Sequence, residues 1–160
     1  MNSKIAKIAG AIVGMMSGVL LYGAGSFDGW GPTAGDFKRA HPDAISIGKD
    51  QMVLKGIPEK EWILFRVAPT ETQGKKQVSI VFKAFGKGKV SVGFFGYRKG
   101  FAFVGQDASE IELKDKAAEY KLNLPVRAGM NLVRPKIHVK PNAEITITDF
   151  RLEVNDASVK

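Results

Sequence analysis

The sequence predicts an all-β protein, a jelly-roll β-sandwich of two antiparallel sheets preceded by a hydrophobic N-terminal signal or anchor helix. Three observations predict it. Apolar and polar residues alternate with a period of two in most segments after residue 30. Clusters of glycine, proline, asparagine and aspartate separate these segments at short intervals. An uncharged apolar run lies near the N-terminus. Many short strands at such spacing are typical of a sandwich or a jelly roll.

The N-terminal segment has the layout of an export signal. Lys4 and Lys7 precede an uncharged stretch from Ile8 to Gly25, and small residues end it. We expect cleavage after Gly25, which leaves residues 26–160 as one domain. The alternative is an uncleaved membrane anchor, because the stretch is close to the shortest helix that spans a bilayer. Either alternative predicts an exported protein that is secreted, periplasmic or held at the cell surface.

Composition narrows the classes of partner. The whole chain has a net charge of +8, which favours anionic partners such as acidic glycans, phospholipid or envelope polymers. Nucleic acid is not expected as a partner, since the chain is exported and has no recognisable nucleic-acid-binding motif. The chain has no cysteine, which excludes disulfides, thiolate metal sites and a cysteine nucleophile. About 135 residues after the leader suit a single core.

Two consecutive segments give the clearest strand pattern. Apolar side chains alternate over residues 78–85 and again over residues 90–95. The link between them is Gly86-Lys87-Gly88, and glycine accepts the positive φ angles of a tight turn. The sequence therefore predicts that these two strands form a β-hairpin.

The same reasoning places the other elements. Strands are predicted at residues 44–47, 51–55, 62–67, 101–104, 111–113, 120–126, 132–139 and 144–154. Turns are predicted at residues 48–50, 70–74, 125–129 and 141–142. The segment 31–42, with its prolines and glycines, is predicted to be a long surface loop.

The strand at 132–139 separates two kinds of side chain. Val133, Pro135, Ile137 and Val139 are predicted on one face, and the other face is predicted to be cationic, with Arg134, Lys136, His138 and Lys140. Proline lacks the amide that a ladder needs, so Pro135 is expected at an edge or a bulge.

Enzyme signatures are not found in the sequence. The only histidines are His41 and His138, and no nucleophile elbow, zinc-protease motif or phosphate-binding loop is present. We therefore predict no enzymatic activity. A pair of carboxylates brought together by folding, as in glycoside hydrolysis, stays open as an alternative.

Sugar binding needs flat apolar rings for the C–H face of a pyranose and polar groups for its hydroxyls. The candidate rings are Trp30, Trp62, Phe95, Tyr97 and Phe101. Trp30 and Trp62 are also expected to pack in the core, whereas Tyr97 lies beside Arg98 and Lys99 and is expected to be exposed.

Both ends of the chain resemble a known family. The stretch Gly25-Ser26-Phe27-Asp28-Gly29-Trp30, the strand after Asn131 and the last strand, 145–153, resemble the β-jelly-roll carbohydrate-binding modules, with galactose-binding-like domains, that accompany polysaccharide-degrading enzymes. The resemblance covers roughly residues 25 to 155. It implies a non-catalytic protein that binds polysaccharide or acidic glycan on one sheet face. The residues implied for that face are Phe95, Tyr97, Arg134, Lys136 and His138.

The resemblance also implies a structural calcium ion, with Asp28 and Asp149 in the positions of two ligands. The alternative reading makes Asp28 a turn residue and Asp149 part of a bulge. Two other functions stay open. One is a structural subunit of the cell envelope or a surface filament that keeps its N-terminal segment, the only case in which a membrane would be a partner. The other is a remote polysaccharide hydrolase or lyase.

Overall fold

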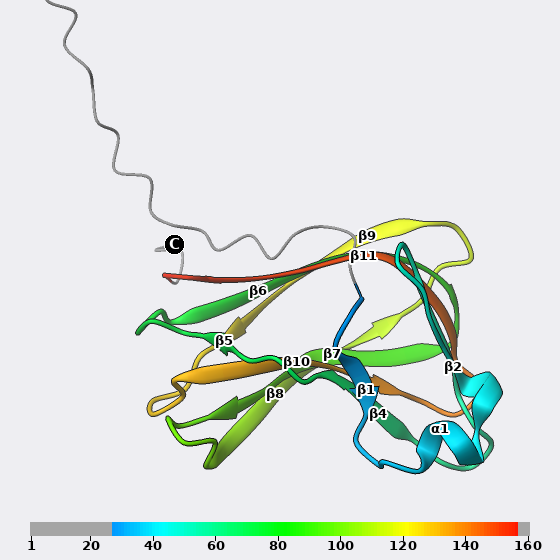
Figure 1. Ribbon diagram of the computed structural model, residues 1–160. Coiled ribbons are helices and arrows are strands. Elements are labelled where there is room, and N and C mark those ends of the chain that lie inside the picture. Colours follow the sequence, from blue (N-terminus) through cyan, green and yellow to red (C-terminus); the bar gives the residue numbers. More distant parts are fainter. Residues whose placement is uncertain (1–26, 157–160) are drawn as a thin grey trace, which may run out of the picture.

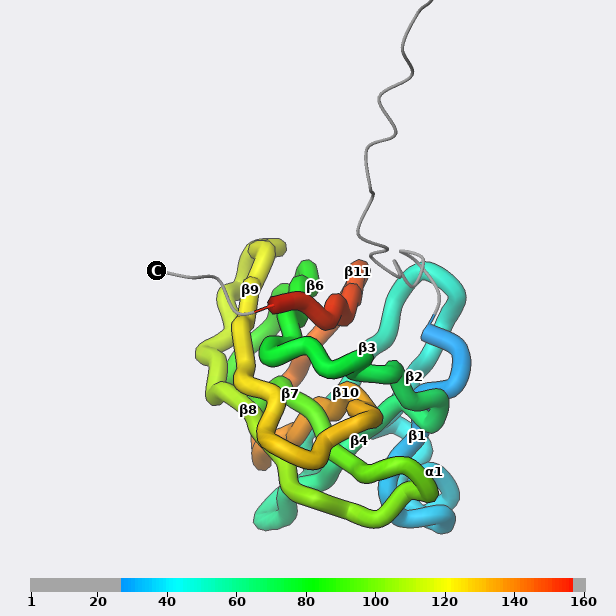
Figure 2. The backbone as a smooth tube through the Cα atoms, turned by 90° about the vertical axis from the view of Figure 1, so that its left-hand side faces the viewer, coloured from blue at the N-terminus to red at the C-terminus, as the bar shows by residue number. Residues whose placement is uncertain are grey.

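A computed structural model describes residues 27–156, which form two antiparallel sheets packed face to face (Figure 1). Sheet A has the order β1-β4-β10-β7-β8, with β5 also paired to β10, and sheet B has the order β2-β3-β11-β6-β9. Viewed from the end of the sandwich, the two layers are separate (Figure 2). The predicted all-β class and the two antiparallel sheets are confirmed. The predicted signal or anchor segment, residues 1–25, lies outside the described residues.

The bounds of the strands are as follows. Sheet A contains β1 (Trp30–Pro32), β4 (Trp62–Arg66), β5 (Thr70–Glu71), β7 (Lys89–Tyr97), β8 (Phe103–Glu112) and β10 (Leu132–Val139). Sheet B contains β2 (Ile45–Ile47), β3 (Met52–Lys55), β6 (Gln77–Lys87), β9 (Ala118–Pro125) and β11 (Glu144–Asn155).

The core lies between the sheets and consists of the inward half of each alternating strand. Phe82 of β6 and Phe94 of β7 are fully buried there, together with Ile137 of β10 and Ile147 of β11. Burial of one such side chain stabilises the fold by about 1.5–3 kcal/mol. The outward half of each strand of sheet A is thus left to form a separate surface.

The link Gly86-Lys87-Gly88 is not a hairpin, and that prediction is wrong. β6 pairs with β9 and β11, whereas β7 pairs with β8 and β10. The chain therefore passes from sheet B to sheet A at this link. Gly86 and Gly88 have φ angles of 151° and 80°, and a Cβ on Gly86 would lie 1.9 Å from the carbonyl oxygen of Glu144. Glycine is needed here for a corner between sheets.

The segment 31–42 is not a long loop. It contains most of β1, the short helix α1 (Phe37–Ala40) and the start of the 3₁₀ helix η1 (Pro42–Ala44). Phe37 is buried, and its ring centroid lies 4.6 Å from that of Trp62. Packing of Phe37, together with the pairing of β1 with β4, holds the segment against the end of the core.

Three further predictions are corrected. Residues 101–104 and 111–113 do not form two strands, because β8 is one continuous strand paired along its length with β7. The middle of β8 is polar, so it lacks the apolar alternation from which a strand is predicted. An edge strand can form without that alternation, because backbone pairing with one neighbour and burial of one side are enough. Thr70 and Glu71 form β5 rather than a turn.

Pro135 does not lie in an edge strand, because β10 is in the interior of sheet A. On one side of β10, Val133 is the last residue that pairs with β5, and Lys136 is the first that pairs with β4. Pro135 lies in the interval between these two ladders. A residue without an amide is tolerated where no neighbour requires its hydrogen bond.

No helix in residues 27–156 has the length and apolar character that crossing a membrane requires.

Candidate functional site

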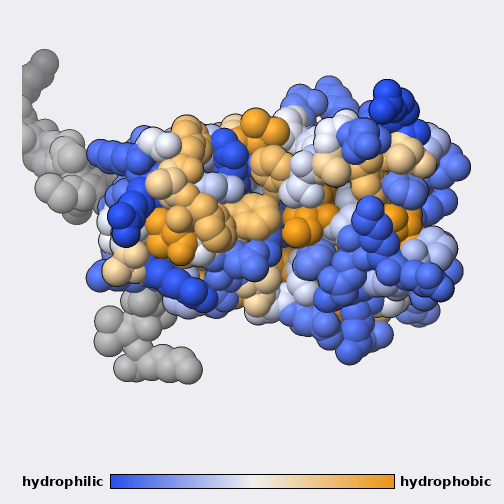
Figure 3. Space-filling model, turned by 90° about the horizontal axis from the view of Figure 1, so that it is seen from below, coloured by the Kyte–Doolittle hydropathy of each residue, from blue (hydrophilic) through white to orange (hydrophobic). Residues whose placement is uncertain are grey.

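The outer face of sheet A brings together most of the predicted ligand-binding residues. β7 and β10 are antiparallel neighbours, and their register places Phe95 opposite Arg134 and Tyr97 opposite Leu132. Lys136 and His138 follow on the same side of β10, because alternate residues of a strand share a face. Figure 3 looks onto this face and shows a band of apolar surface bordered by hydrophilic side chains.

Five aromatic rings form a continuous group on this face, which we call the aromatic platform. It consists of Phe65 from β4, Phe95 and Tyr97 from β7, Phe101 from the β7–β8 turn and Phe103 from β8. Neighbouring ring centroids are 5.9–6.4 Å apart in edge-to-face arrangements, the separation that aromatic pairs prefer. Phe101 and Phe103 are 49% and 60% exposed. The platform therefore offers apolar ring surface to solvent.

Arg134 lies among these rings. Its guanidinium carbon is 4.7 Å from the ring centroid of Phe101, 5.3 Å from that of Tyr97 and 6.0 Å from that of Phe65. Guanidinium groups at such distances are attracted to the negative ring faces. The platform thus fixes a permanent positive charge at its centre.

Lys136 is the second cation of the platform, and it is only 3% exposed. Its ammonium nitrogen lies 4.6 Å from the ring centroid of Phe95 and donates a hydrogen bond to Oε1 of Gln106 in β8. Burial lowers the pKa of this ammonium, and the charge of Asp107 opposes the shift. Lys136 was predicted as a ligand-binding residue; its side chain is buried beneath the surface of the platform, and its part in binding stays a prediction.

His138 lies on the same face, beyond the platform. Its Nε2 is 3.1 Å from Glu61 Oε2, and Lys140 Nζ is 2.8 Å from the other oxygen of Glu61. Burial lowers the pKa of His138, which Glu61 partly offsets. The hydrogen bond from Lys140 lowers the pKa of Glu61. His138 therefore belongs to an ion-paired cluster rather than to the group around Arg134.

The β7–β8 turn holds Phe101 in an uncommon backbone conformation. Its φ is 65°, next to Gly100 at 83°, and a positive φ is a genuine outlier for a bulky side chain. Hydrogen bonds from the Arg98 amide to the Ala102 carbonyl and from the Phe101 amide to the Arg98 carbonyl close the turn. This conformation brings the Phe101 ring against Arg134, and such strain is concentrated at functional sites.

Trp30 and Trp62, which were predicted either to bind sugar or to pack in the core, pack against the core. Trp62 is buried, and its indole N–H donates to the Lys55 carbonyl. The ring of Trp30 is half-buried, with its centroid 5.0 Å from that of Phe150. Phe65, Phe103 and Gln106 belong to this face but were not predicted from the sequence. Phe65 could have been predicted, because Trp62 and Leu64 point inward from this strand and Phe65, one residue after Leu64, must point outward.

The two predicted calcium ligands, Asp28 and Asp149, lie at a turn and next to a bulge, as the alternative to calcium binding predicted. Asp28 is in the turn before β1. Asp149 follows a bulge in β11, and its Oδ2 lies 3.4 Å from Arg151 Nε, while its Oδ1 is buried without a hydrogen-bond partner. Within residues 27–156 no cluster of three or more histidine and carboxylate side chains could hold a metal ion. An unpaired carboxylate oxygen is a suitable ligand atom, so calcium binding at Asp149 stays a prediction.

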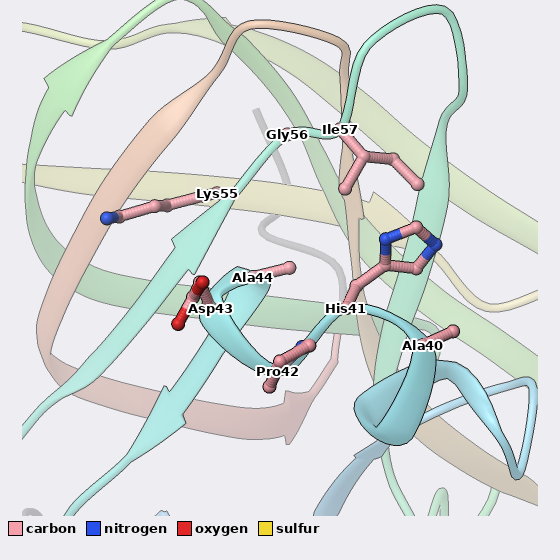
Figure 4. A pocket seen from close by; sticks show the side chains of 8 residues that line it. All are labelled: Ala40, His41, Pro42, Asp43, Ala44, Lys55, Gly56 and Ile57. Atoms are coloured by element: carbon pink, nitrogen blue, oxygen red, sulfur yellow. The ribbon is translucent and has the colours of Figure 1, made fainter.

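A pocket of about 290 Å³ lies at the end of the sandwich beneath η1. His41 and Ile57 lie on one side of it, and Lys55 and Asp43 extend away from His41 (Figure 4). His41 also packs on the ring of Phe37, with centroids 4.9 Å apart. The polar groups of this pocket therefore do not converge on a common point.

No protein-family profile and no curated protein match this sequence. Solved structures do match its fold. The family 29 carbohydrate-binding module from Piromyces equi aligns with a TM-score of 0.54 and 15% identity over 89% of this chain and 93% of that chain. The family 22 xylan-binding domain from Paenibacillus barcinonensis aligns with a TM-score of 0.52 and 12% identity over 86% and 96% of the two chains.

Part of an enzyme domain is also similar in fold. The enzymatically active domain of tailspike protein 4 from bacteriophage CBA120 aligns with a TM-score of 0.53 and 13% identity. The match covers 64% of this chain and 15% of the tailspike chain. The fold is therefore that of carbohydrate-binding-module β-sandwiches, a fold that an enzyme domain can also contain.

Proposed function

We propose that this protein is an exported, non-catalytic carbohydrate-binding protein that binds polysaccharide on the outer face of sheet A. The observation that carries the proposal is the aromatic platform of five rings, three of which contact the guanidinium of Arg134. Rings supply surface for the C–H faces of sugar residues, and Gln106 and Arg134 supply polar groups for hydroxyls. Related folds support this assignment, since one carries a xylan-binding name and another was determined with mannohexaose.

Acidic polysaccharides are the proposed ligand class. Arg134 and Lys136 place two positive charges two residues apart on one strand, and the chain has a net charge of +8. The charged row continues to His138 and Lys140 along β10, although Glu61 balances that end. A positive surface attracts polyanions over a distance set by the ionic strength.

The absence of catalysis is also part of the proposal. Glycoside hydrolysis uses two carboxyl groups that flank the scissile bond. Two carboxylates of this face are instead paired with cations, Glu61 with Lys140 and Glu110 with Lys89. A polysaccharide hydrolase or lyase, the alternative that the tailspike similarity keeps open, would be revealed by release of reducing or unsaturated ends from a polymer.

Export and location rest on the N-terminal sequence. Lys4, Lys7 and the uncharged run to Gly25 support a secreted, periplasmic or surface protein. N-terminal sequencing of the protein isolated from its host would distinguish a cleaved signal from a retained anchor. A retained segment would favour a structural subunit of the envelope or of a surface filament, with the membrane or neighbouring subunits as partners.

Affinity electrophoresis against a panel of neutral and acidic polysaccharides tests the proposal. We expect acidic polymers to retard the protein, with less retardation at high salt and in Tyr97→Ala. Phe85→Ala is the matched control, because Phe85 is an exposed aromatic residue of β6 in the other sheet. Retardation that is equal in Tyr97→Ala and in the wild type would indicate nonspecific charge attraction. Absence of retardation by every polymer would contradict the proposal.

A further inference from the structure

Arg134 differs from several other cations in its partners. Lys89 of β7, Lys140 just after β10 and Arg127 of the β9–β10 loop each contact a carboxylate. Among residues 27–156, the contacts recorded for the Arg134 guanidinium are instead with aromatic rings, and no ion pair includes it. Its Nε is buried and makes no hydrogen bond to any described residue. The platform therefore holds a guanidinium that forms no ion pair with a described carboxylate.

Aromatic rings orient a guanidinium without neutralising it. A cation–π contact leaves the net charge of the group unchanged and leaves its in-plane N–H donors unused. Lys136 adds a second positive charge on the same face; it forms no ion pair with a described carboxylate, although the charge of Asp107 acts on it. Because Lys136 is 3% exposed, it can strengthen the positive potential but cannot itself contact a polymer. Arg134 is thus the group that an anion on this surface would meet.

We infer that Arg134 recognises the carboxylate of a uronic acid residue, so that the polymer bound on this face is a polyuronate. The inference rests on the proposed function and names its ligand class. Arginine presents parallel donors in one plane, which matches the two oxygens of a carboxylate in a bidentate pair. The adjacent rings of Tyr97 and Phe101 place a sugar surface beside that pair. A uronic acid offers both groups at once, since its carboxylate extends from the rim of its pyranose ring.

The first test uses the wild-type protein and requires no variant. Binding of polygalacturonate is compared, by isothermal titration calorimetry at one ionic strength, with binding of the same polymer after its carboxyl groups have been reduced to alcohols. We expect reduction to weaken binding about tenfold to a hundredfold, the range for losing a charge-assisted hydrogen-bond pair. Equal affinity for the two polymers would overturn the inference.

The second test separates the planar guanidinium from its charge. Arg134→Lys keeps the positive charge but loses the two parallel N–H donors of the guanidinium. We therefore expect it to weaken polygalacturonate binding nearly as much as Arg134→Gln does. Arg98→Gln is the control, because Arg98 is an exposed arginine of the same turn that lies on the side of Gly129. Thermal unfolding establishes that each variant folds. Full binding by Arg134→Lys, or equal losses in Arg134→Gln and Arg98→Gln, would overturn the inference.

Dextran sulfate and a neutral xylan complete the panel. If the wild-type protein bound xylan or the reduced polymer as tightly as polygalacturonate, the carboxylate inference would be overturned. The proposed carbohydrate site would then remain. Binding of dextran sulfate as tightly as polygalacturonate would show recognition of charge alone and would also overturn the inference. Failure of every polymer to bind would overturn the proposed function itself, and the inference with it.

Discussion

Lys136 of β10 reaches across β7 and donates a hydrogen bond to Gln106 of β8. The residue of β7 that pairs with Lys136 is Gly93, which has no side chain to obstruct the path. The amine passes along the ring of Phe95, 4.6 Å from its centroid. One side chain therefore joins three strands beneath the surface that we propose for binding.

A buried lysine of this kind should cost stability. Lys136 is desolvated, which lowers its pKa, and replacing a buried charge with a flexible apolar side chain removes that penalty. We expect Lys136→Met to unfold at the same temperature as the wild type or higher, while its affinity for acidic polymers falls. Gln106 stays exposed to water and can still make hydrogen bonds. A clearly lower melting temperature would contradict this account of Lys136.

Replacing Phe101, the strained residue of the β7–β8 turn, should also affect binding without reducing stability. Phe101 has a φ of 65°, a conformation that asparagine adopts more readily than phenylalanine. We expect Phe101→Asn to be as stable as the wild type or more stable by up to about 1 kcal/mol, as measured by urea unfolding. Loss of the ring beside Arg134 should weaken polymer retardation. Strong destabilisation would mean that packing of Phe101 outweighs its backbone strain.

The corner between β6 and β7 depends on Gly88, whose φ is 80°. A Cβ there would also lie 3.1 Å from the Cα of Ala143. Gly88→Val should therefore destabilise the protein by about 1 kcal/mol or more, because a β-branched residue is strained at positive φ. Gly35→Ala is the control, since that position has an ordinary φ and open space around it. Equal stabilities of the two variants in chemical denaturation would contradict the role of Gly88.

Stability should fall as the pH decreases past the titration of His138. Burial lowers the pKa of this residue in the folded protein, so the unfolded chain takes up its proton first. The contribution of neutral His138 is complete above the unfolded pKa of about 6.5 and is lost as the pH falls through that value and then through the lower folded pKa. His138→Gln should flatten the plot of unfolding free energy against pH from about 7.5 to 5.5. An unchanged slope in this variant would assign the pH dependence to other groups.

Calcium binding is testable by thermal unfolding. If Asp28 and Asp149 are ligands, calcium added to chelator-stripped protein should raise the melting temperature, because a ligand of the folded state stabilises that state. Asp149→Ala should abolish the increase, whereas Asp43→Ala, an exposed residue of η1, should retain it. A wild-type melting temperature that is independent of calcium would leave Asp149 with Arg151 as its partner.

Several features of this protein follow from local pattern alone. Alternation over 132–139 determines that Val133 and Ile137 enter the core and that Arg134 is directed outward, because side chains of a strand alternate strictly. The same rule places Phe95 and Tyr97 on one face of β7. The prediction that these residues share a surface needed only the correct pairing of β7 with β10.

Other features depend on contacts between segments distant in sequence. Whether Gly86-Lys87-Gly88 forms a hairpin or a corner between sheets is not encoded by the glycines, since both need positive φ; the pairing of β6 with β9 and β11 decides it. The burial of Lys136 likewise comes from Phe95 and Gln106 on two other strands. A sequence pattern gives the direction of a side chain, whereas its solvation depends on neighbours that only the folded chain brings together.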